Sequence, residues 1–331
     1  MKISTFPHAL SRLAHRALLT FALSITAGAV AAAPASSKTE TRTQYPIVMV
    51  HGLFGFGQAL GVVDYFWGIP AALRAGGANV YIAEVSSVQS NEVRGEQLLQ
   101  QIDTILAITG AEKVNIIAHS QGAPTARYAA GVAPEKIASV TSFGGAHKGS
   151  KLGDLIGGVK DVTDRLGPAG IGVQTLILRI VEAAGRIEDT LTGKPGEITA
   201  NALGALSANS TRGMVNFNQR FPAALPPTYC GTEGASSVQG VRYWSWTGSS
   251  PSTNVFDPFD YLTLFTKIIY FGAPNDGIND NCTQRLGKVI GDYPYNHFDE
   301  INQLVGLRGL FSPDPVRLYY DHARRLKAAG L

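Results

Sequence analysis

Apolar runs and amphipathic runs alternate along the first half of the chain. A continuous apolar run, rich in β-branched residues, predicts a buried strand at 46–50, and further strands are expected at 80–85, 114–118 and 137–143. Between them, apolar residues recur with helical spacing at 92–106, and a further helix is expected at 123–130. Strands that alternate with helices indicate a parallel sheet with right-handed crossovers, so the pattern predicts an α/β fold.

The alternation stops between residues 152 and 220, where Gly, Ser, Thr and Ala dominate. One amphipathic helix is predicted inside this stretch, at 173–191. Its spacing favours an ordinary core-packing helix, and a lid over a neighbouring site is the alternative. Strand-like runs resume at 241–246 and 264–271, and the pattern predicts a closing helix around 316–326.

The first 33 residues have the pattern of a secretory signal peptide. Three basic residues without acids precede an apolar segment at 17–30, and small residues follow at 31–35. The apolar segment is shorter than the roughly 20 residues that a membrane span needs. We therefore expect cleavage near Ala33, a polar segment at 34–44, and one domain at 45–331 with an insertion at about 152–220.

Composition narrows the class of protein further. A hydrophobic fraction of 45% supports a substantial core. The leader carries three of the 28 basic residues and none of the 25 acidic ones, so the mature chain has 25 of each and a charge of about zero. The basic balance of the whole chain is therefore no sign of nucleic-acid binding. Zinc-ligand spacing and a phosphate-binding loop are also missing from the sequence.

The exported part contains two cysteines, Cys230 and Cys282. In an oxidising compartment an even pair favours a disulfide, and two buried free thiols are the alternative. A loop of about 50 residues closed in this way stabilises a protein by roughly 4 kcal/mol in the chain-entropy model.

A serine follows the third predicted strand. Ser120 lies between that strand and a helix, with the small residues Ala118 and Gly122 two positions before and after it. This is the layout of a nucleophile elbow, which pushes a serine hydroxyl into an open cleft. Ala118 stands where the usual motif has glycine, and one added methyl group should leave the turn intact. Because similar turns occur in α/β proteins without a catalytic serine, the rest of the chain has to supply its partners.

A serine nucleophile needs an imidazole base, and the imidazole needs a carboxylate. His297 lies in a loop near the C-terminus, and Asp276 is expected at the end of the strand predicted at 264–271. The resulting order Ser, Asp, His is that of α/β-hydrolases. A turn-capping Asp276 and a loop-packing His297 are the alternatives. His119 is expected to point away from the cleft, and the remaining histidines of the exported part fit a catalytic base less well: His51, His147 and His322.

Ester hydrolysis also needs two N–H donors for the oxyanion. The backbone N–H of Gln121, directly after the serine, is the first candidate. The second is the N–H of Leu53, in the glycine-rich loop that follows the first predicted strand.

With these residues in place, the chain resembles the secreted true lipases of the Pseudomonas/Burkholderia type. The similarity is clearest at 45–57, 93–101, 114–150 and 275–331. Two motifs carry it most specifically: Val140-Thr141-Ser142-Phe143-Gly144-Gly145-Ala146-His147-Lys148-Gly149-Ser150 and Asn296-His297-Phe298-Asp299-Glu300-Ile301-Asn302-Gln303. The resemblance implies an α/β-hydrolase fold with a mostly parallel sheet flanked by helices, a helical lid, and hydrolysis of triacylglycerols.

The resemblance also assigns roles to individual residues. It implies a catalytic triad of Ser120, Asp276 and His297, with Leu53 and Gln121 as the oxyanion donors. It implies a disulfide between Cys230 and Cys282. It also implies one structural Ca²⁺, held by the carboxylates of Asp257 and Asp299 and by the backbone carbonyls of Gln303 and Leu307. A hard cation at this place would pin the histidine loop to the body of the protein without taking part in the chemistry. For Asp257, capping of a turn before Pro258 is an alternative that is compatible with ligation.

The same resemblance implies export to the periplasm, folding with a dedicated membrane-anchored foldase, and release by type II secretion. The expected enzyme is extracellular and acts on acylglycerols at a lipid–water interface. A carboxylesterase or polyester depolymerase with the same triad is one alternative. A catalytically silent hydrolase-fold protein is another, and the complete set of triad residues argues against it.

Overall fold

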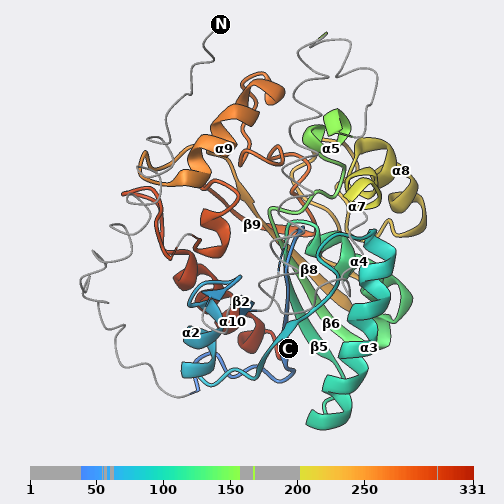
Figure 1. Cartoon of the computed structure of the whole chain (residues 1–331). Coiled ribbons are helices and arrows are strands. Elements are labelled where there is room, and N and C mark those ends of the chain that lie inside the picture. The colour runs from blue at the N-terminus through green and yellow to red at the C-terminus, as the bar shows by residue number, and fades with distance from the viewer. Residues whose placement is uncertain are drawn as a thin grey trace, which may run out of the picture. The chain divides into compact units, whose positions relative to one another are not determined.

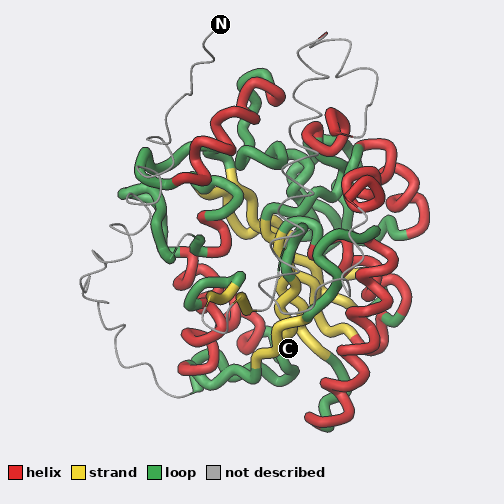
Figure 2. Tube along the Cα trace, in the orientation of Figure 1, coloured by secondary structure: helices red, strands yellow, loops and turns green. Residues whose placement is uncertain are grey.

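A mostly parallel sheet runs through the centre of the protein, with helices on both sides (Figures 1 and 2). The computed structural model describes residues 39–53, 55, 58–59, 63–156, 167, 202–303 and 305–331 of the 331. These residues belong to one compact unit, Lys38–Leu331. Among them, no helix has the length and apolar character that a bilayer crossing requires.

The sheet has the strand order β4-β1-β5-β6-β8-β7, and β9 also pairs with β8. Its strands are β1 (Ile47–Val50), β4 (Val80–Ala83), β5 (Val114–His119), β6 (Ile137–Phe143), β7 (Ser237–Val238), β8 (Val241–Gly248) and β9 (Lys288–Tyr293). All pairs are parallel except β7 with β8. A small antiparallel pair, β2 (Gln58–Ala59) and β3 (Val63–Asp64), stands apart from it. Because parallel strands end at the same edge, the loops after β1, β5, β8 and β9 share one side of the sheet.

Helices cover the two faces of the sheet. The α-helices are α2 (Ile69–Ala75), α3 (Asn91–Thr109), α4 (Gly122–Val132), α5 (Lys151–Ile156), α7 (Ala202–Ala208), α8 (Thr211–Arg220), α9 (Pro258–Thr266) and α10 (Pro315–Ala328), and the 3₁₀ turns are η1 (Pro134–Lys136), η2 (Lys267–Tyr270) and η3 (Asp299–Ile301). Figure 1 shows α3 and α4 on one side and α2 and α10 on the other.

Alternation along β5 divides its side chains between two cores. Ile116 and Ala118 belong to the core under α3 and α4, whereas Ile117 belongs to the core that α2 and α10 cover. His119 comes next in the alternation and therefore faces the same side as Ile117. This orientation places a histidine beside the core that contains Tyr65 and Ile301.

Helix ends follow from local chemistry. The Ser90 hydroxyl accepts a hydrogen bond from Val93 N at the start of α3, and Gly110, with φ of 67°, ends that helix. Asp314 caps α10 through Val316 N, and Pro315 opens the helix, where no backbone donor is needed. The strands and helices expected in the first half, and the closing helix, are thus present with small shifts of their ends.

One predicted strand is wrong. Residues 264–271 were expected as a strand, but 264–266 end α9, 267–270 form η2, and Phe271 lies in the turn that follows. The apolar run at 264–271 begins inside a helix that has already started. Pro258 opens this helix, and the Asp257 side chain caps it by accepting a hydrogen bond from Phe259 N at 2.8 Å. The strand that completes the sheet is β9, which is only half-buried and contains Gly291 and Asp292, so its sequence lacks a continuous apolar run.

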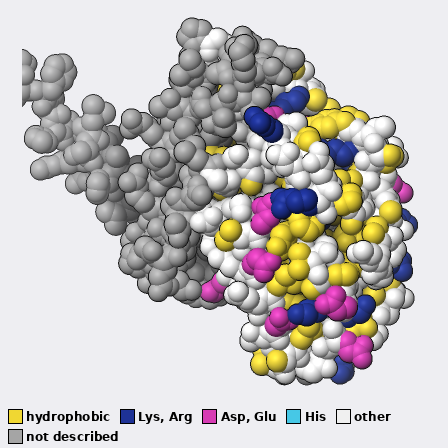
Figure 3. Space-filling model, turned by 90° about the vertical axis from the view of Figure 1, so that its right-hand side faces the viewer, with side chains coloured by type: hydrophobic (Ala, Val, Ile, Leu, Met, Phe, Trp, Pro, Cys, Tyr) yellow, Lys and Arg dark blue, Asp and Glu magenta, His cyan; other side chains and the backbone are white. Residues whose placement is uncertain are grey.

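The outer face formed by α3, α4 and α8 mixes apolar and charged side chains (Figure 3). Exposed valines, such as Val93 and Val215, lie among ion pairs, including Arg220 with Glu92.

At the N-terminal end of the described chain, Thr41 is buried and its hydroxyl donates to the carbonyl of Leu73 at 2.6 Å. Residues just before β1 are therefore packed against α2.

Candidate active site

Ser120 lies in the turn between β5 and α4. Its φ of 55° is in the left-handed region, which non-glycine residues adopt rarely, and such strain is concentrated at functional turns. Its N–H donates to the carbonyl of Phe143 at the end of β6, which fixes the turn to the sheet. A side chain at Gly122 would lie 2.4 Å from the carbonyl oxygen of Val50, so only glycine lets α4 approach β1 this closely. The expected elbow turn is therefore present, with Ala118 buried before it.

Three residues from distant segments form one hydrogen-bonded line. His297 Nε2 lies 2.8 Å from Ser120 Oγ, and His297 Nδ1 lies 2.8 Å from Asp276 Oδ2. The other Asp276 oxygen accepts from the N–H groups of Ile278 and Asn279. The Asp276 carboxylate can only accept hydrogen bonds, so the proton of the neutral imidazole lies on Nδ1. Nε2 therefore presents its lone pair to the serine hydroxyl. This is the geometry of a Ser-His-Asp triad.

The position of Asp276 differs in one respect from the expectation. It does not follow a strand; it lies in a turn after η2, beside an isolated bridge between Asn275 and Asp280. The turn is tied to the histidine loop by the backbone, because His297 N donates to the carbonyl of Asp276 at 2.9 Å.

Of the two expected oxyanion donors, one belongs to the serine turn itself, and the other follows a glycine that packs against Ser120. Gln121 follows Ser120 directly at the N-terminus of α4, where the helix dipole favours negative charge. A side chain at Gly52 would lie 2.6 Å from Ser120 Cβ, so the backbone before Leu53 passes directly against the serine.

His51 fixes the peptide that carries the Leu53 N–H. Its Nδ1 lies 2.9 Å from the carbonyl oxygen of Gly52, and in a trans peptide that oxygen points opposite to the next N–H. Burial, together with the Arg94 guanidinium, lowers the pKa of His51 to about 3. The imidazole is therefore neutral at pH 7, and its Nδ1–H donates to Gly52.

His119 and Glu300 are two polar residues at the triad to which the sequence assigned no role. His119 was expected to point away from the cleft, but its ring lies 4.5 Å from the ring of His297, centroid to centroid. Its Nε2 is 3.0 Å from Glu300 Oε2, and both side chains are buried. Burial, and next the charge of His297, lowers the pKa of His119 well below 6.5. Strand alternation could have placed His119 on this face, whereas nothing local in the sequence pairs it with Glu300.

The two remaining histidines among the described residues are core residues. His147 Nε2 bonds to Ser142 Oγ at 2.8 Å, and His322 Nε2 bonds to Thr141 Oγ1 at 2.7 Å. Burial lowers the pKa of both well below 6.5, so both are neutral at pH 7.

Two buried aspartates fit a divalent cation. Asp257 Oδ2 and Asp299 Oδ1 each lack a hydrogen-bond partner among the described residues, although both side chains are fully buried. Burial, with the nearby charges of Asp257 and Asp260, raises the pKa of Asp299 to about 7, and burial also raises that of Asp257. Buried, unpartnered carboxylate oxygens of this kind are what a hard cation with oxygen ligands would satisfy.

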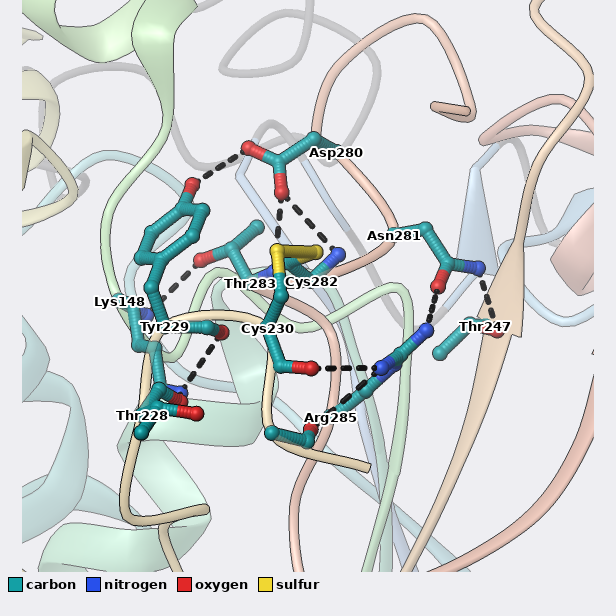
Figure 4. Close-up of a disulfide and its surroundings, with 11 residues drawn as sticks. Lys148, Thr228, Tyr229, Cys230, Thr247, Asp280, Asn281, Cys282, Thr283 and Arg285 are labelled. Atoms are coloured by element: carbon teal, nitrogen blue, oxygen red, sulfur yellow. Dashed lines mark hydrogen bonds between the residues drawn. A yellow bond between two sulfur atoms is a disulfide. The ribbon is translucent and has the colours of Figure 1, made fainter. Parts of the chain in front are cut away.

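A disulfide joins Cys230 to Cys282 (Figure 4), as the pair of cysteines predicts. Next to it, the Tyr229 hydroxyl donates to Asp280 at 2.6 Å, and Arg285 donates to the carbonyl of Cys230 at 3.2 Å. These contacts hold the segment that follows Asp276 against the loop before β7.

The amphipathic helix predicted at 173–191 lies outside the described residues, as does most of the insertion at 152–220.

The chain matches known proteins over nearly its whole length. A family model of the alpha/beta hydrolase fold matches residues 45–160. A triacylglycerol lipase of Vibrio cholerae is 48% identical over 95% of this chain and 97% of its own. Triacylglycerol lipases of Pseudomonas fragi and Burkholderia plantarii are 41% and 38% identical, over 87% and 91% of this chain and 98% and 92% of theirs.

Solved structures agree on the fold. Lipase 1 from Pelosinus fermentans superposes with a TM-score of 0.56 at 17% identity, covering 86% of this chain and 99% of its own. Bacillus licheniformis lipase BlEst2 in mature form gives a TM-score of 0.52 at 18% identity, covering 81% and 88%. These comparisons confirm the resemblance found in the sequence: the chain belongs to the bacterial triacylglycerol lipases, enzymes of the α/β-hydrolase fold.

Proposed function

We propose that this enzyme hydrolyses long-chain acylglycerols by acyl transfer through Ser120. The observation that carries the proposal is the line Ser120–His297–Asp276, with 2.8 Å at both hydrogen bonds. In the first step His297 Nε2 takes the hydroxyl proton as Ser120 Oγ attacks the ester carbonyl. Asp276 holds the other ring nitrogen and stabilises the imidazolium that forms.

The negative oxygen of the tetrahedral intermediate would then receive hydrogen bonds from the N–H groups of Leu53 and Gln121. Each such donor is typically worth about 3 kcal/mol of transition-state stabilisation. Next, the imidazolium of His297 gives its proton to the departing glycerol oxygen, which leaves an acyl group on Ser120. In the second half of the reaction His297 takes a proton from water, whose oxygen attacks this ester, and returns that proton to Ser120 Oγ as the fatty acid leaves.

We further propose that one Ca²⁺ binds the carboxylates of Asp257 and Asp299 and the backbone carbonyls of Gln303 and Leu307. The two unpartnered carboxylate oxygens support this assignment. The bound ion would supply structural stability, because Asp299 lies two residues after His297 and one before Glu300. The protein's own residues carry out every proton transfer.

The expectations about the surroundings of the enzyme remain proposals. A cleaved leader near Ala33, passage through the periplasm with a dedicated foldase and type II secretion, and a helical lid at the lipid–water interface all rest on the sequence. The disulfide supports an oxidising destination. N-terminal sequencing of the exported protein tests the leader, and higher activity on emulsions than on dissolved esters tests the lid.

The test of the function compares wild type with Ser120→Ala on an emulsified long-chain triglyceride and on a dissolved short-chain ester. We expect strong fatty-acid release from the emulsion by the calcium-loaded wild type and none by the variant. Activity restricted to the dissolved ester would retain the triad and replace the lipase by an esterase. Folded protein that is inactive on both substrates would contradict the proposal.

A further inference from the structure

We infer that Tyr65, His119 and Glu300 form a buried hydrogen-bonded chain that positions the oxyanion loop against the nucleophile and the base. The inference rests on the proposed function for its catalytic consequence. None of the three residues is given a chemical step above. Each of them contacts a different part of the machinery, and the contacts link segments that are far apart in the sequence.

The chain begins at the oxyanion loop. Gly52 N–H donates to the Tyr65 hydroxyl at 3.0 Å, and Gly52 is the residue before the proposed oxyanion donor Leu53. The position is crowded: a side chain at Gly52 would lie 2.9 Å from the Tyr65 hydroxyl and 3.1 Å from Ser120 Oγ. The tyrosine hydroxyl therefore fixes the backbone where it passes the nucleophile.

The chain continues through the residue before the serine. The Tyr65 hydroxyl lies 2.7 Å from His119 Nδ1, and His119 Nε2 lies 3.0 Å from Glu300 Oε2. Glu300 Oε2 is in turn 3.8 Å from Nδ1 of His297. One imidazole thus uses both of its nitrogens to join the oxyanion side to the turn that follows the catalytic base.

Backbone contacts close this chain into a ring. The Gln303 amide donates to the carbonyl of Tyr65 at 3.0 Å, and Trp67 N donates to the carbonyl of Ile301 at 3.1 Å. The tyrosine backbone is therefore anchored to the same turn that carries Glu300. A ring of bonds among buried groups resists displacement of any one segment, since moving it would leave polar groups unpaired.

The consequence is a requirement on catalytic geometry and not on substrate affinity. Misplacing a catalytic group by about 1 Å can cost about 100-fold in rate. Loss of the Tyr65 hydroxyl frees the Gly52 peptide next to Ser120, while the contacts of the tyrosine ring with His51, Phe66 and His119 can remain. We therefore expect Tyr65→Phe to lower kcat by about 10- to 100-fold with KM on a dissolved short-chain ester changed less than threefold.

The matched control is Tyr319→Phe. The Tyr319 hydroxyl is also buried and its pKa responds to the charge of Glu300, but it has no hydrogen-bond partner among the described residues. Its removal should leave kcat within about twofold of the wild-type value.

A conservative variant, Glu300→Gln, keeps an oxygen that accepts from His119 Nε2–H and should retain most of the activity. His119→Phe keeps a ring against His297 but breaks both bonds, and it should lose about as much as Tyr65→Phe.

Coupling tests whether the residues act as one unit. In the His119→Phe background, Tyr65→Phe should cost little further activity, because residues of one network are not additive. Additive losses, equal losses in Tyr65→Phe and Tyr319→Phe, or a Glu300→Gln variant as inactive as His119→Phe would each overturn the inference.

A measurement independent of turnover separates this inference from the proposed function. In the wild type the Gly52 amide should be protected from hydrogen exchange, and Tyr65→Phe should accelerate its exchange at least tenfold while Tyr319→Phe does not. Unchanged exchange in Tyr65→Phe refutes the chain even if the enzyme is a lipase. Wild-type protein that shows protected Gly52 and the predicted acceleration, yet does not hydrolyse any ester, would retain the contact and refute the function.

Discussion

Gly122→Ala tests how closely the helix after the nucleophile must approach the first strand. A methyl group at Gly122 would lie 2.4 Å from the carbonyl oxygen of Val50 and 2.7 Å from that of His51. The first distance is about 1 Å shorter than the 3.4 Å at which ordinary contact begins. Both obstacles are backbone atoms at the end of β1, so a change of side-chain rotamer cannot relieve the clash.

The expected result follows from where that displacement occurs. Moving the start of α4 away from β1 separates Ser120 and the Gln121 N–H from the loop that carries Leu53. A shift of about 1 Å between catalytic groups costs about 100-fold in kcat, whereas overpacking of this kind costs roughly 1–3 kcal/mol of stability. The variant should therefore remain folded and become nearly inactive.

The assay is kcat on a dissolved p-nitrophenyl ester, with thermal unfolding of the same samples. Gly131→Ala is the matched control, because it lies on the same helix and its methyl group would meet only the side chain of Phe221, at 2.6 Å. We expect the control to keep kcat within about threefold. A folded Gly122→Ala variant with wild-type kcat would refute the view that this glycine sets the spacing of the site.

Three further predictions concern the acid, the cation site and the response to pH. Asp276→Asn should keep the fold and lower kcat by about 10⁴-fold, the loss found when such a triad loses its carboxylate; a loss below tenfold would remove Asp276 from the triad. Calcium chelation should lower the melting temperature by about 5–10 °C, as expected for an ion at about 100 times its Kd. The Asp257→Asn variant should show no such response, and equal responses in both proteins would contradict the assignment. Because burial and Arg94 lower the pKa of His51 to about 3, the stability that its neutral form confers is present above pH 6.5 and lost on acidification towards pH 3. At roughly 1.4 kcal/mol per pKa unit this amounts to roughly 5 kcal/mol at most. Denaturant titrations at several pH values should show that the free energy of unfolding depends less on pH in His51→Asn than in the wild type. An identical pH dependence in both proteins would refute the reasoning.

Local patterns were sufficient to predict most of the sheet, because its central strands are buried on both faces. β1 is a continuous apolar run, and β5 and β6 are mainly small, apolar or β-branched residues that are buried throughout, as parallel strands between two helix layers require. The same criterion failed at 264–271, where an apolar run belongs to helical segments, and at β9, whose half-buried sequence alternates weakly. Short apolar runs do not distinguish a strand from a buried helix without their tertiary surroundings.

The residues of the candidate site were also predicted only in part from the sequence. Ser120 was found from its turn, and Asp276 and His297 from their order and motifs. Glu300 was missed, because its partner His119 is 181 residues away and only the folded chain brings them together. A buried carboxylate carries no local signal, since acidic residues after a loop histidine usually lie at the surface.

The most direct test of the central claim is to identify the atom that carries the acyl group. Calcium-loaded enzyme is treated with a long-chain alkyl phosphonate that mimics the tetrahedral intermediate, and the adduct is mapped by peptide mass spectrometry in the wild type and in His297→Ala. We expect one adduct, on Ser120, formed rapidly by the wild type and at least 1,000-fold more slowly by the variant, in keeping with the loss expected when a triad base is removed. An adduct on any other residue, or equally fast labelling of both proteins, would contradict the central claim.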